Sequence, residues 1–140
     1  MYNIIHNAVL ALILMLISTM SFASDDITAI TKVVEKYFDG TSQGKPELVR
    51  QAFADSLELQ SVSKNGSLRR WLGADYIANI KQGKTNSRIG KIIAIDITDN
   101  AAIVKATVTT NKSLFTDYLL LLKLQSGWQI TNKIYTAKKR

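Results

Sequence analysis

The pattern of apolar positions divides the chain into two halves after residue 23. In the first half, apolar side chains recur at the three- and four-residue spacing of helices. Ser24, Asp25 and Asp26 supply capping oxygens and negative charge, and Asp39-Gly40 ends the pattern, so we expect an amphipathic helix of about three turns. Because proline suits the first position of a helix, Pro46 predicts the start of a second one. The expected elements of this half are helices at 27–38, 46–53 and 74–81 and a strand at 57–62.

From residue 88 onward the period changes to two, which is typical of half-buried β-strands. Asp99-Asn100, Asn111-Lys112 and Ser126-Gly127 are turn signals that separate four such segments. Four strands joined by short turns predict an antiparallel meander, and helices segregated from it make the expected fold class α+β. The expected strands are 88–97, 102–110, 115–125 and 128–135.

The alternation also predicts which side chains face the core, if lysine marks the solvent side of each strand. Lys105, Lys123 and Lys133 are the markers. They place Asp117 on the outer face, where we expect a surface or dimer-interface ion pair with Lys123. Leu119, Leu121 and Tyr135 are expected to face outward too. The residues expected to face inward are Ala102, Val104, Ala106 and Val108, then Thr116, Tyr118, Leu120, Leu122 and Leu124, and finally Trp128, Ile130, Asn132 and Ile134.

An unbroken apolar run, AVLALILMLI, precedes the helical pattern at residues 8–17. Ser21 and Ala23 are small residues at the positions that precede the cleavage site of a secretory signal, so we expect cleavage between Ala23 and Ser24. A membrane-spanning helix needs ~20 apolar residues, more than this run contains. A retained N-terminal anchor is the alternative. The expected division is a signal peptide, 1–23, and one periplasmic or secreted domain, 24–140.

Composition narrows the chemistry of the expected domain. The 140 residues include no cysteine and a single histidine, His6, which lies in the expected signal. The domain would then lack disulfides, thiolate nucleophiles, Ser-His pairs and the commonest metal ligands, so we expect no metal and no cofactor. The formal net charge is +7. We expect solvated charge and no nucleic-acid partner, because no recognition motif is present. Most of the excess lies in Arg69-Arg70, in Lys81, Lys84, Arg88 and Lys91, and in Lys138-Lys139-Arg140.

Five segments, in this order, resemble the bacterial branch of the nuclear transport factor two-like superfamily that is called putative lumazine-binding. They end the first helix, form the second, open the meander, lie on its third strand and form its last strand. The segments are Tyr37-Phe38-Asp39-Gly40, 46–53, 90–96, 115–119 and 127–135.

The resemblance implies a cone, in which N-terminal helices close the concave face of a strongly curved antiparallel sheet around an internal cavity. It also implies dimers through the outer face of the sheet. Superfamily enzymes such as ketosteroid isomerase place Asp, His or Tyr in the cavity. Relatives often carry a histidine before the acidic residue of the first strand, whereas here Ala54 precedes Asp55. Chemistry that depends on that imidazole is therefore not expected.

The lining of the implied cavity would be aliphatic with few polar groups, which suits a small apolar or heterocyclic molecule. The candidate ligand contacts are Tyr37, Thr116, Tyr118, Trp128 and Asn132. For each aromatic residue among them the commoner alternative is a core residue whose polar tip is satisfied locally. The amide of Asn132 needs partners among apolar neighbours, which either the backbone or a ligand can supply.

We therefore expect an exported, non-catalytic small-molecule-binding domain that forms a homodimer. One alternative is a lyase or isomerase that uses a buried aspartate of raised pKa, since no histidine is available. Asp117 and Asp96 are the strand aspartates considered for that role. The other alternative is a dimeric interaction module without a ligand, which docks a partner on the outer face of its sheet.

Overall fold

The structure is a computed structural model that describes residues 25–140. The expected signal peptide, its cleavage site between Ala23 and Ser24, and the alternative of a retained anchor lie outside the described residues. Within the described part, no helix is both long and apolar enough to cross a membrane.

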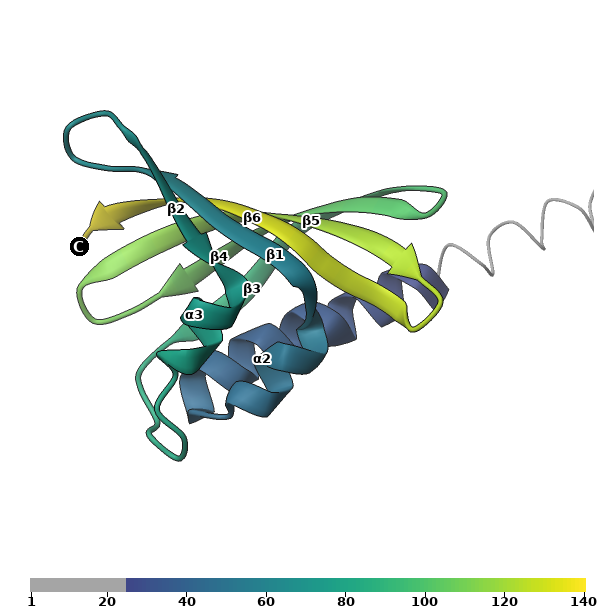
Figure 1. The fold of residues 1–140 in the computed structure, drawn as a ribbon, viewed down its shortest axis with the longest axis horizontal. Helices are drawn as coiled ribbons and strands as arrows, with labels where there is room; N and C mark the ends of the chain where they lie inside the picture. Colours follow the sequence, from purple (N-terminus) through teal and green to yellow (C-terminus); the bar gives the residue numbers. More distant parts are fainter. Residues whose placement is uncertain (1–24) are drawn as a thin grey trace, which may run out of the picture.

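Helices cover one face of a single curved sheet, so the expected α+β class is confirmed (Figure 1). Residues 25–43 are helical, and we call this segment the long helix. Two short helices follow it, α2 (Pro46–Ala52) and α3 (Gly73–Ala78). The strands are β1 (Phe53–Val62), β2 (Leu68–Leu72), β3 (Ile89–Thr98), β4 (Ala101–Thr109), β5 (Ser113–Leu124) and β6 (Gly127–Lys139).

The sheet has the strand order β2-β1-β6-β5-β4-β3. The expected meander of β3 to β6 is confirmed, because each of its strands pairs antiparallel with the next. The sheet as a whole is mixed rather than antiparallel, since β1 and β6 run parallel. Parallel pairing needs a long connection, and the chain between β1 and β6 supplies it.

The hairpin of β1 and β2 was not expected, because β2 shows no one-sided alternation. Leu68 and Leu72, at its two ends, are 64% and 56% exposed. The turn contains Gly66 at a φ of +85°, a left-handed conformation that favours glycine. Arg70 holds the two strands together through two hydrogen bonds to the Glu58 carboxylate, of 2.6 and 3.1 Å.

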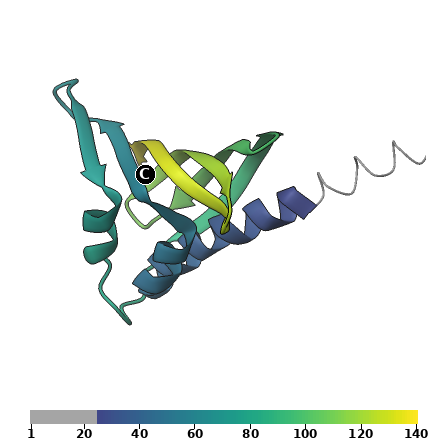
Figure 2. The same cartoon turned by 45° about the vertical axis from the view of Figure 1, so that its right-hand side comes forward.

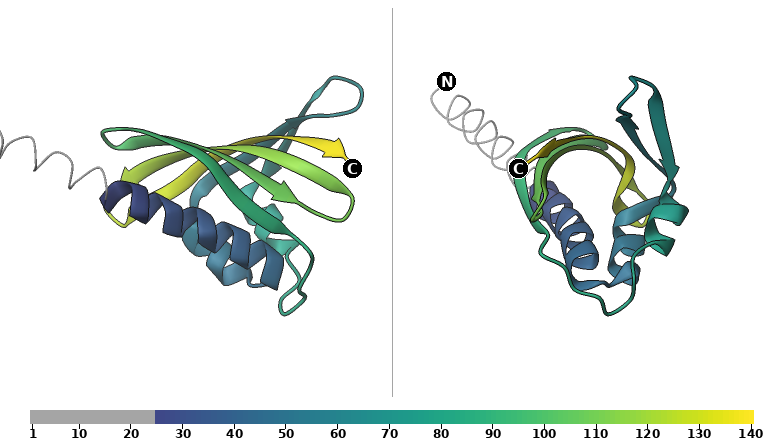
Figure 3. Two further views of the ribbon diagram at one scale, coloured as in Figure 1. Left: turned by 180° about the vertical axis from the view of Figure 1, so that it is seen from behind. Right: turned by 90° about the vertical axis from the view of Figure 1, so that its left-hand side faces the viewer.

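The sheet curls over the long helix like an arch (Figures 2 and 3). Ile30, Val34 and Tyr37 lie on successive turns of that helix and are fully buried against the concave face. Gly90 permits the close approach of the helix to β3, because the ring of Phe38 occupies the space that a Cβ atom would need. The long helix is therefore packed directly against the concave side of the sheet.

The structure confirms the predicted facing of β4 and reverses that of β5. Ala102, Val104, Ala106 and Val108 are buried as expected. On β5, however, Asp117, Leu119 and Leu121 are buried, while four residues expected to face inward are 39–43% exposed: Tyr118, Leu120, Leu122 and Leu124. The marker Lys123 failed because it lies on the concave side at the end of the strand. There its ammonium reaches the long helix and pairs with Asp26 at 2.7 Å.

The predicted facing of β6 is correct for its first half and wrong for its second. Trp128 and Ile130 are buried as expected. Leu121 then pairs with Ile130 while Leu120 pairs with Asn132, so Thr131 is an extra residue, a β-bulge. The bulge switches the faces of the rest of the strand. Lys133 is therefore only 4% exposed, whereas Ile134 is 49% exposed.

Asp26 ties the start of the described part of the long helix to the end of the meander. Its carboxylate accepts hydrogen bonds from the Trp128 indole N–H at 2.9 Å and from Lys123. The hydrogen bond to Lys123, followed by that to Trp128, lowers the pKa of Asp26 below its ordinary value of 3.8. A carboxylate whose pKa is lower in the folded protein than in the unfolded chain stabilises the fold at any pH above the unfolded pKa. This stabilisation is lost as the pH falls through the folded pKa.

We predict that Asp26→Asn lowers the urea midpoint of unfolding at pH 7, and that this deficit shrinks once the pH falls below 3.8. Urea titrations across the acid range, followed by tryptophan fluorescence, measure the difference. Asp25→Asn is the matched control on the neighbouring exposed residue. A deficit that stays constant across this range would contradict an ionised Asp26 as its source.

Candidate functional site

Tyr37, Asp117 and Lys133 come together under the arch from the long helix, β5 and β6, and we call them the buried triad. The Tyr37 hydroxyl donates a hydrogen bond of 2.9 Å to Asp117 Oδ2, and the Lys133 ammonium donates one of 2.7 Å to the same oxygen. Lys133 also donates to the Tyr37 hydroxyl. None of the three residues is more than 4% exposed.

The triad is an ion pair held in an apolar core by a neutral phenol. Burial raises the pKa of Tyr37 far above its ordinary value of 10.0, and the negative charge of Asp117 raises it further, so the hydroxyl remains a donor. Lys133 lies 4.7 Å from the centre of the Tyr37 ring and 5.2 Å from that of Tyr135, which adds cation–π attraction. Asp117 Oδ1 is buried without a hydrogen-bond partner among the described residues.

Tyr76 of α3 connects the triad to the surface. Burial raises the pKa of its hydroxyl above 10.0, and the nearby Tyr37 phenol raises it further. The Tyr76 ring packs edge-on against Trp71, with 5.3 Å between the ring centres, and lies 6.1 Å from the ring of Phe53. Tyr76 is thus held in place by the packing of its ring against two other aromatic rings.

An open pocket of about 350 Å³ lies above Tyr76, and we call it the basic pocket. It sits where the end of the long helix, α3 and the segment between α3 and β3 meet. The residues that line it are Thr41, Trp71, Tyr76, Asn79, Ile80, Lys81, Lys84, Asn86 and Arg88. Its lining contains two aromatic rings and three cations, and no carboxylate.

The pocket exists because the segment between α3 and β3 folds back on the end of the long helix. The Gly83 N–H donates to the Gly44 carbonyl at 2.8 Å. Asn86 donates its backbone N–H to the Ser42 carbonyl at 2.8 Å and its side-chain amide to the Thr41 carbonyl at 2.7 Å. Gly44 has a φ of +64°, and a Cβ atom there would meet this returning backbone. The close approach therefore needs glycine.

The structure does not bring the five expected ligand contacts together. Tyr37 belongs to the buried triad, and Trp128 is a core residue whose indole N–H is taken by Asp26. Thr116, Tyr118 and Asn132 lie on the outer face of the sheet instead of the concave one, because of the reversed facing of β5 and the bulge in β6. A ligand-binding role for these residues stays a prediction, as does an enclosed cavity within the cone.

Sequence reasoning missed Asp117 and Lys133 as a pair, although one signal was present. Asp117 interrupts the otherwise uncharged segment 113–122, and a charge inside such a strand is buried only when it is paired. A buried aspartate of this kind predicts a basic partner on a neighbouring strand, and Lys133 of β6 is that partner. Among the described residues, no three His, Cys, Asp or Glu side chains gather to hold a metal ion.

We predict that Lys133→Met destabilises the protein by about 3–5 kcal/mol, because it leaves the Asp117 carboxylate buried without its counter-charge. The double variant with Asp117→Leu removes both charges and should recover about half of that loss or more. Urea unfolding followed by circular dichroism measures both values. Lys105→Met, an exposed lysine on β4, is the matched control. A cost below about 1 kcal/mol for Lys133→Met would mean that this ammonium is not desolvated.

Comparisons with known proteins agree with this geometry. The family model described as "Putative lumazine-binding" matches residues 25–136. The fold is similar to the crystal structure of an NTF2-like protein of unknown function from Shewanella baltica OS155, with a TM-score of 0.73 and 25% identity, over 82% of this chain and 95% of that chain. No curated protein matches the chain.

Two further solved structures share the fold. An NTF2-like protein of unknown function from Silicibacter pomeroyi DSS-3 has a TM-score of 0.73 at 20% identity, over 83% of this chain and 98% of that chain. A ketosteroid isomerase-like protein from Erwinia carotovora atroseptica has a TM-score of 0.61 at 15% identity, over 80% and 95%. The chain therefore belongs to the putative lumazine-binding family, and its fold is that of the nuclear transport factor two-like superfamily.

Proposed function

We propose that this protein binds a small aromatic heterocycle in the basic pocket. The observation that carries the proposal is a solvent-open space of about 350 Å³ in which Trp71 and Tyr76 stand beside three cationic side chains. Apolar and aromatic walls with a few directional polar groups are typical of pockets for small organic molecules, and this volume lies within their usual range. The description of the family names lumazine, a bicyclic heterocycle, which supports a ring of this size.

The buried triad supports the proposal because it fixes the floor of the pocket. Asp117 and Lys133 hold Tyr37, whose ring lies 5.4 Å from that of Phe53. The Phe53 ring lies in turn 6.1 Å from that of Tyr76. A side chain that is already immobile loses little conformational entropy when a ligand stacks on it. The pocket would therefore bind with its aromatic floor preorganised.

The burial of Asp117 is the one observation that favours the alternative of a lyase or isomerase. Two features weigh against it. Asp117 does not line the basic pocket, and its Oδ2 is engaged by both Tyr37 and Lys133. A general base must reach the proton that it removes, directly or through one water. We therefore place Asp117 in a structural role and propose binding without catalysis.

Export is a second part of the proposal. The apolar run at 8–17 and the small residues Ser21 and Ala23 support a secretory signal that is cleaved before Ser24. The protein would then act in the periplasm or outside the cell. The intact mass of the protein recovered from the periplasm tests this, since a product that keeps residues 1–23 would contradict it.

A homodimer is the third part, and an apolar stripe on the outer face of the sheet supports it. The stripe crosses β4, β5 and β6, and its residues are 39–49% exposed: Ile103, Tyr118, Leu120, Leu122 and Ile134. Contiguous exposed apolar surface of this kind is typical of protein interfaces. A second copy of the chain would cover the stripe through a two-fold contact.

We predict that lumazine binds to the wild-type protein and that Trp71→Leu weakens this binding about tenfold or more, because stacking on an aromatic ring is lost while apolar volume is kept. Isothermal titration calorimetry measures both dissociation constants. Tyr118→Leu is the matched control, since it removes an aromatic ring from the outer face of the sheet. Weakening by Tyr118→Leu alone would place the ligand on that face and contradict the proposal.

We predict that Leu120→Lys converts a dimer into a monomer, because each copy would bring a charge to the centre of the stripe. Sedimentation velocity across a concentration series measures the change. Ile27→Lys is the control, since Ile27 is an isoleucine of the long helix that is 47% exposed. A wild-type protein that remains monomeric at high concentration would remove this part of the proposal.

A further inference from the structure

We infer that the ligand of the basic pocket is an anion, a planar ring that carries a carboxylate or a phosphate group. This inference rests on the proposed binding function and adds the charge of the ligand to it.

The three cations of the pocket lack counter-charges. No carboxylate among residues 25–140 forms an ion pair with Lys81, Lys84 or Arg88. Elsewhere the described part of the chain does pair such groups, as Arg70 with Glu58 and Lys123 with Asp26 show. Three like charges around one small volume repel each other, and an anion placed among them relieves that repulsion.

Arg88 is the most constrained of the three. Its backbone N–H donates to Asn86 Oδ1 at 3.1 Å, and its guanidinium lies 5.8 Å from the centre of the Phe115 ring. Its Nε is buried and has no hydrogen-bond partner among the described residues. A buried N–H without an acceptor is costly, so an oxygen that reaches it gains more than it would at an exposed donor. The planar guanidinium matches carboxylate and phosphate oxygens in particular.

The side-chain amides of Asn79 and Asn86, which also line the pocket, do not offset the preference of the cations for an anion. The Asn79 side-chain amide donates to the Asp75 carbonyl at 2.8 Å, and that of Asn86 donates to the Thr41 carbonyl. One of the two N–H donors of each amide is therefore used within the protein. The cationic donors of Lys81, Lys84 and Arg88 also line the pocket, and they favour a ligand group that only accepts hydrogen bonds.

Positive charges also act on the Tyr76 phenol, which lines the pocket, and on the Tyr37 phenol. Arg88 acts on both Tyr37 and Tyr76, and Lys133 acts on Tyr76, in each case lowering the pKa of the phenol against the larger effect of burial. A ring stacked near Tyr76 would therefore be oriented with its negative substituent toward Arg88. Lys81 and Lys84 are the other positive charges in the lining.

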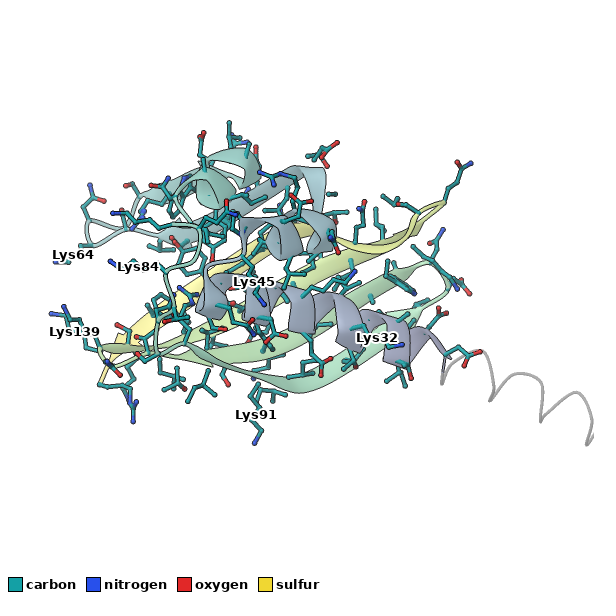
Figure 4. All side chains as sticks on the ribbon, turned by 90° about the horizontal axis from the view of Figure 1, so that it is seen from below. Lys32, Lys45, Lys64, Lys84, Lys91 and Lys139 are labelled. Atoms are coloured by element: carbon teal, nitrogen blue, oxygen red, sulfur yellow. The ribbon has the colours of Figure 1, made fainter. Side chains whose placement is uncertain are left out.

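The test compares two ligands that differ by one carboxylate group, lumazine and lumazine-6-carboxylate, by calorimetry at a pH at which the parent ring is neutral. We expect the carboxylate to bind about tenfold more tightly, and this advantage to shrink when salt is raised to about 0.2 M. Lys84→Met and Arg88→Met should each reduce the advantage severalfold. Lys91→Met is the matched control, because Lys91 lies on β3 away from the pocket, whereas Lys84 projects beside α3 (Figure 4).

Each outcome decides the inference. Equal binding of the two ligands, with Trp71→Leu weakening both, would overturn the anionic ligand and leave the proposed function standing. Binding of neither ligand would overturn both. A charge advantage that survives Lys84→Met and Arg88→Met, or is lost in Lys91→Met, would place the anion elsewhere. Competition separates the two anions: displacement by benzoate or by phenyl phosphate supports a carboxylate or a phosphate respectively, and equal displacement by neutral benzamide overturns the inference.

Discussion

The extra residue at Thr131 of β6 is the constraint on which the rest of the structure depends. It turns Lys133 toward the concave face, where the ammonium meets Asp117 of β5. Without the bulge, Asp117 would be buried in an apolar core with no counter-charge. The bulge, the ion pair and the phenol of Tyr37 are therefore one unit, contributed by two strands and the long helix under the arch that Figure 3 shows.

This unit links the core to the surface. Tyr37 donates to Asp117 beneath the sheet, and its ring packs near that of Phe53, which packs in turn near Tyr76 in the lining of the basic pocket. Tyr37 and Lys133 engage Asp117 Oδ2 away from the pocket, and the ring of the same Tyr37 supports the packing of Tyr76, which lines the pocket. Asp117 thus supports the packing beneath the proposed binding pocket and does not line it.

Periodicity located most elements because helices and half-buried strands impose different spacings on apolar residues. It failed where one residue changes the face, as at Thr131, since a bulge leaves no periodic trace. The assumption that a lysine marks the solvent side of a strand failed at Lys133, because this lysine is buried beside a carboxylate partner, Asp117. The basic residues Lys81, Lys84 and Arg88 were visible as a spaced set. Their gathering was not, because it depends on backbone hydrogen bonds between the segment after α3 and the end of the long helix.

The bulged form of β6 can be compared with a regular strand in free energy. A regular strand would bury Ile134 in place of Lys133, and full burial of an isoleucine is worth about 1.5–3 kcal/mol. It would also leave Asp117 unpaired, at a cost of about 3–5 kcal/mol. The comparison favours the bulge by a small margin, and Asp117 is the residue that decides it. The ion pair thus contributes less to net stability than to the choice of register, and that register keeps Ile134 on the outer face beside Tyr118.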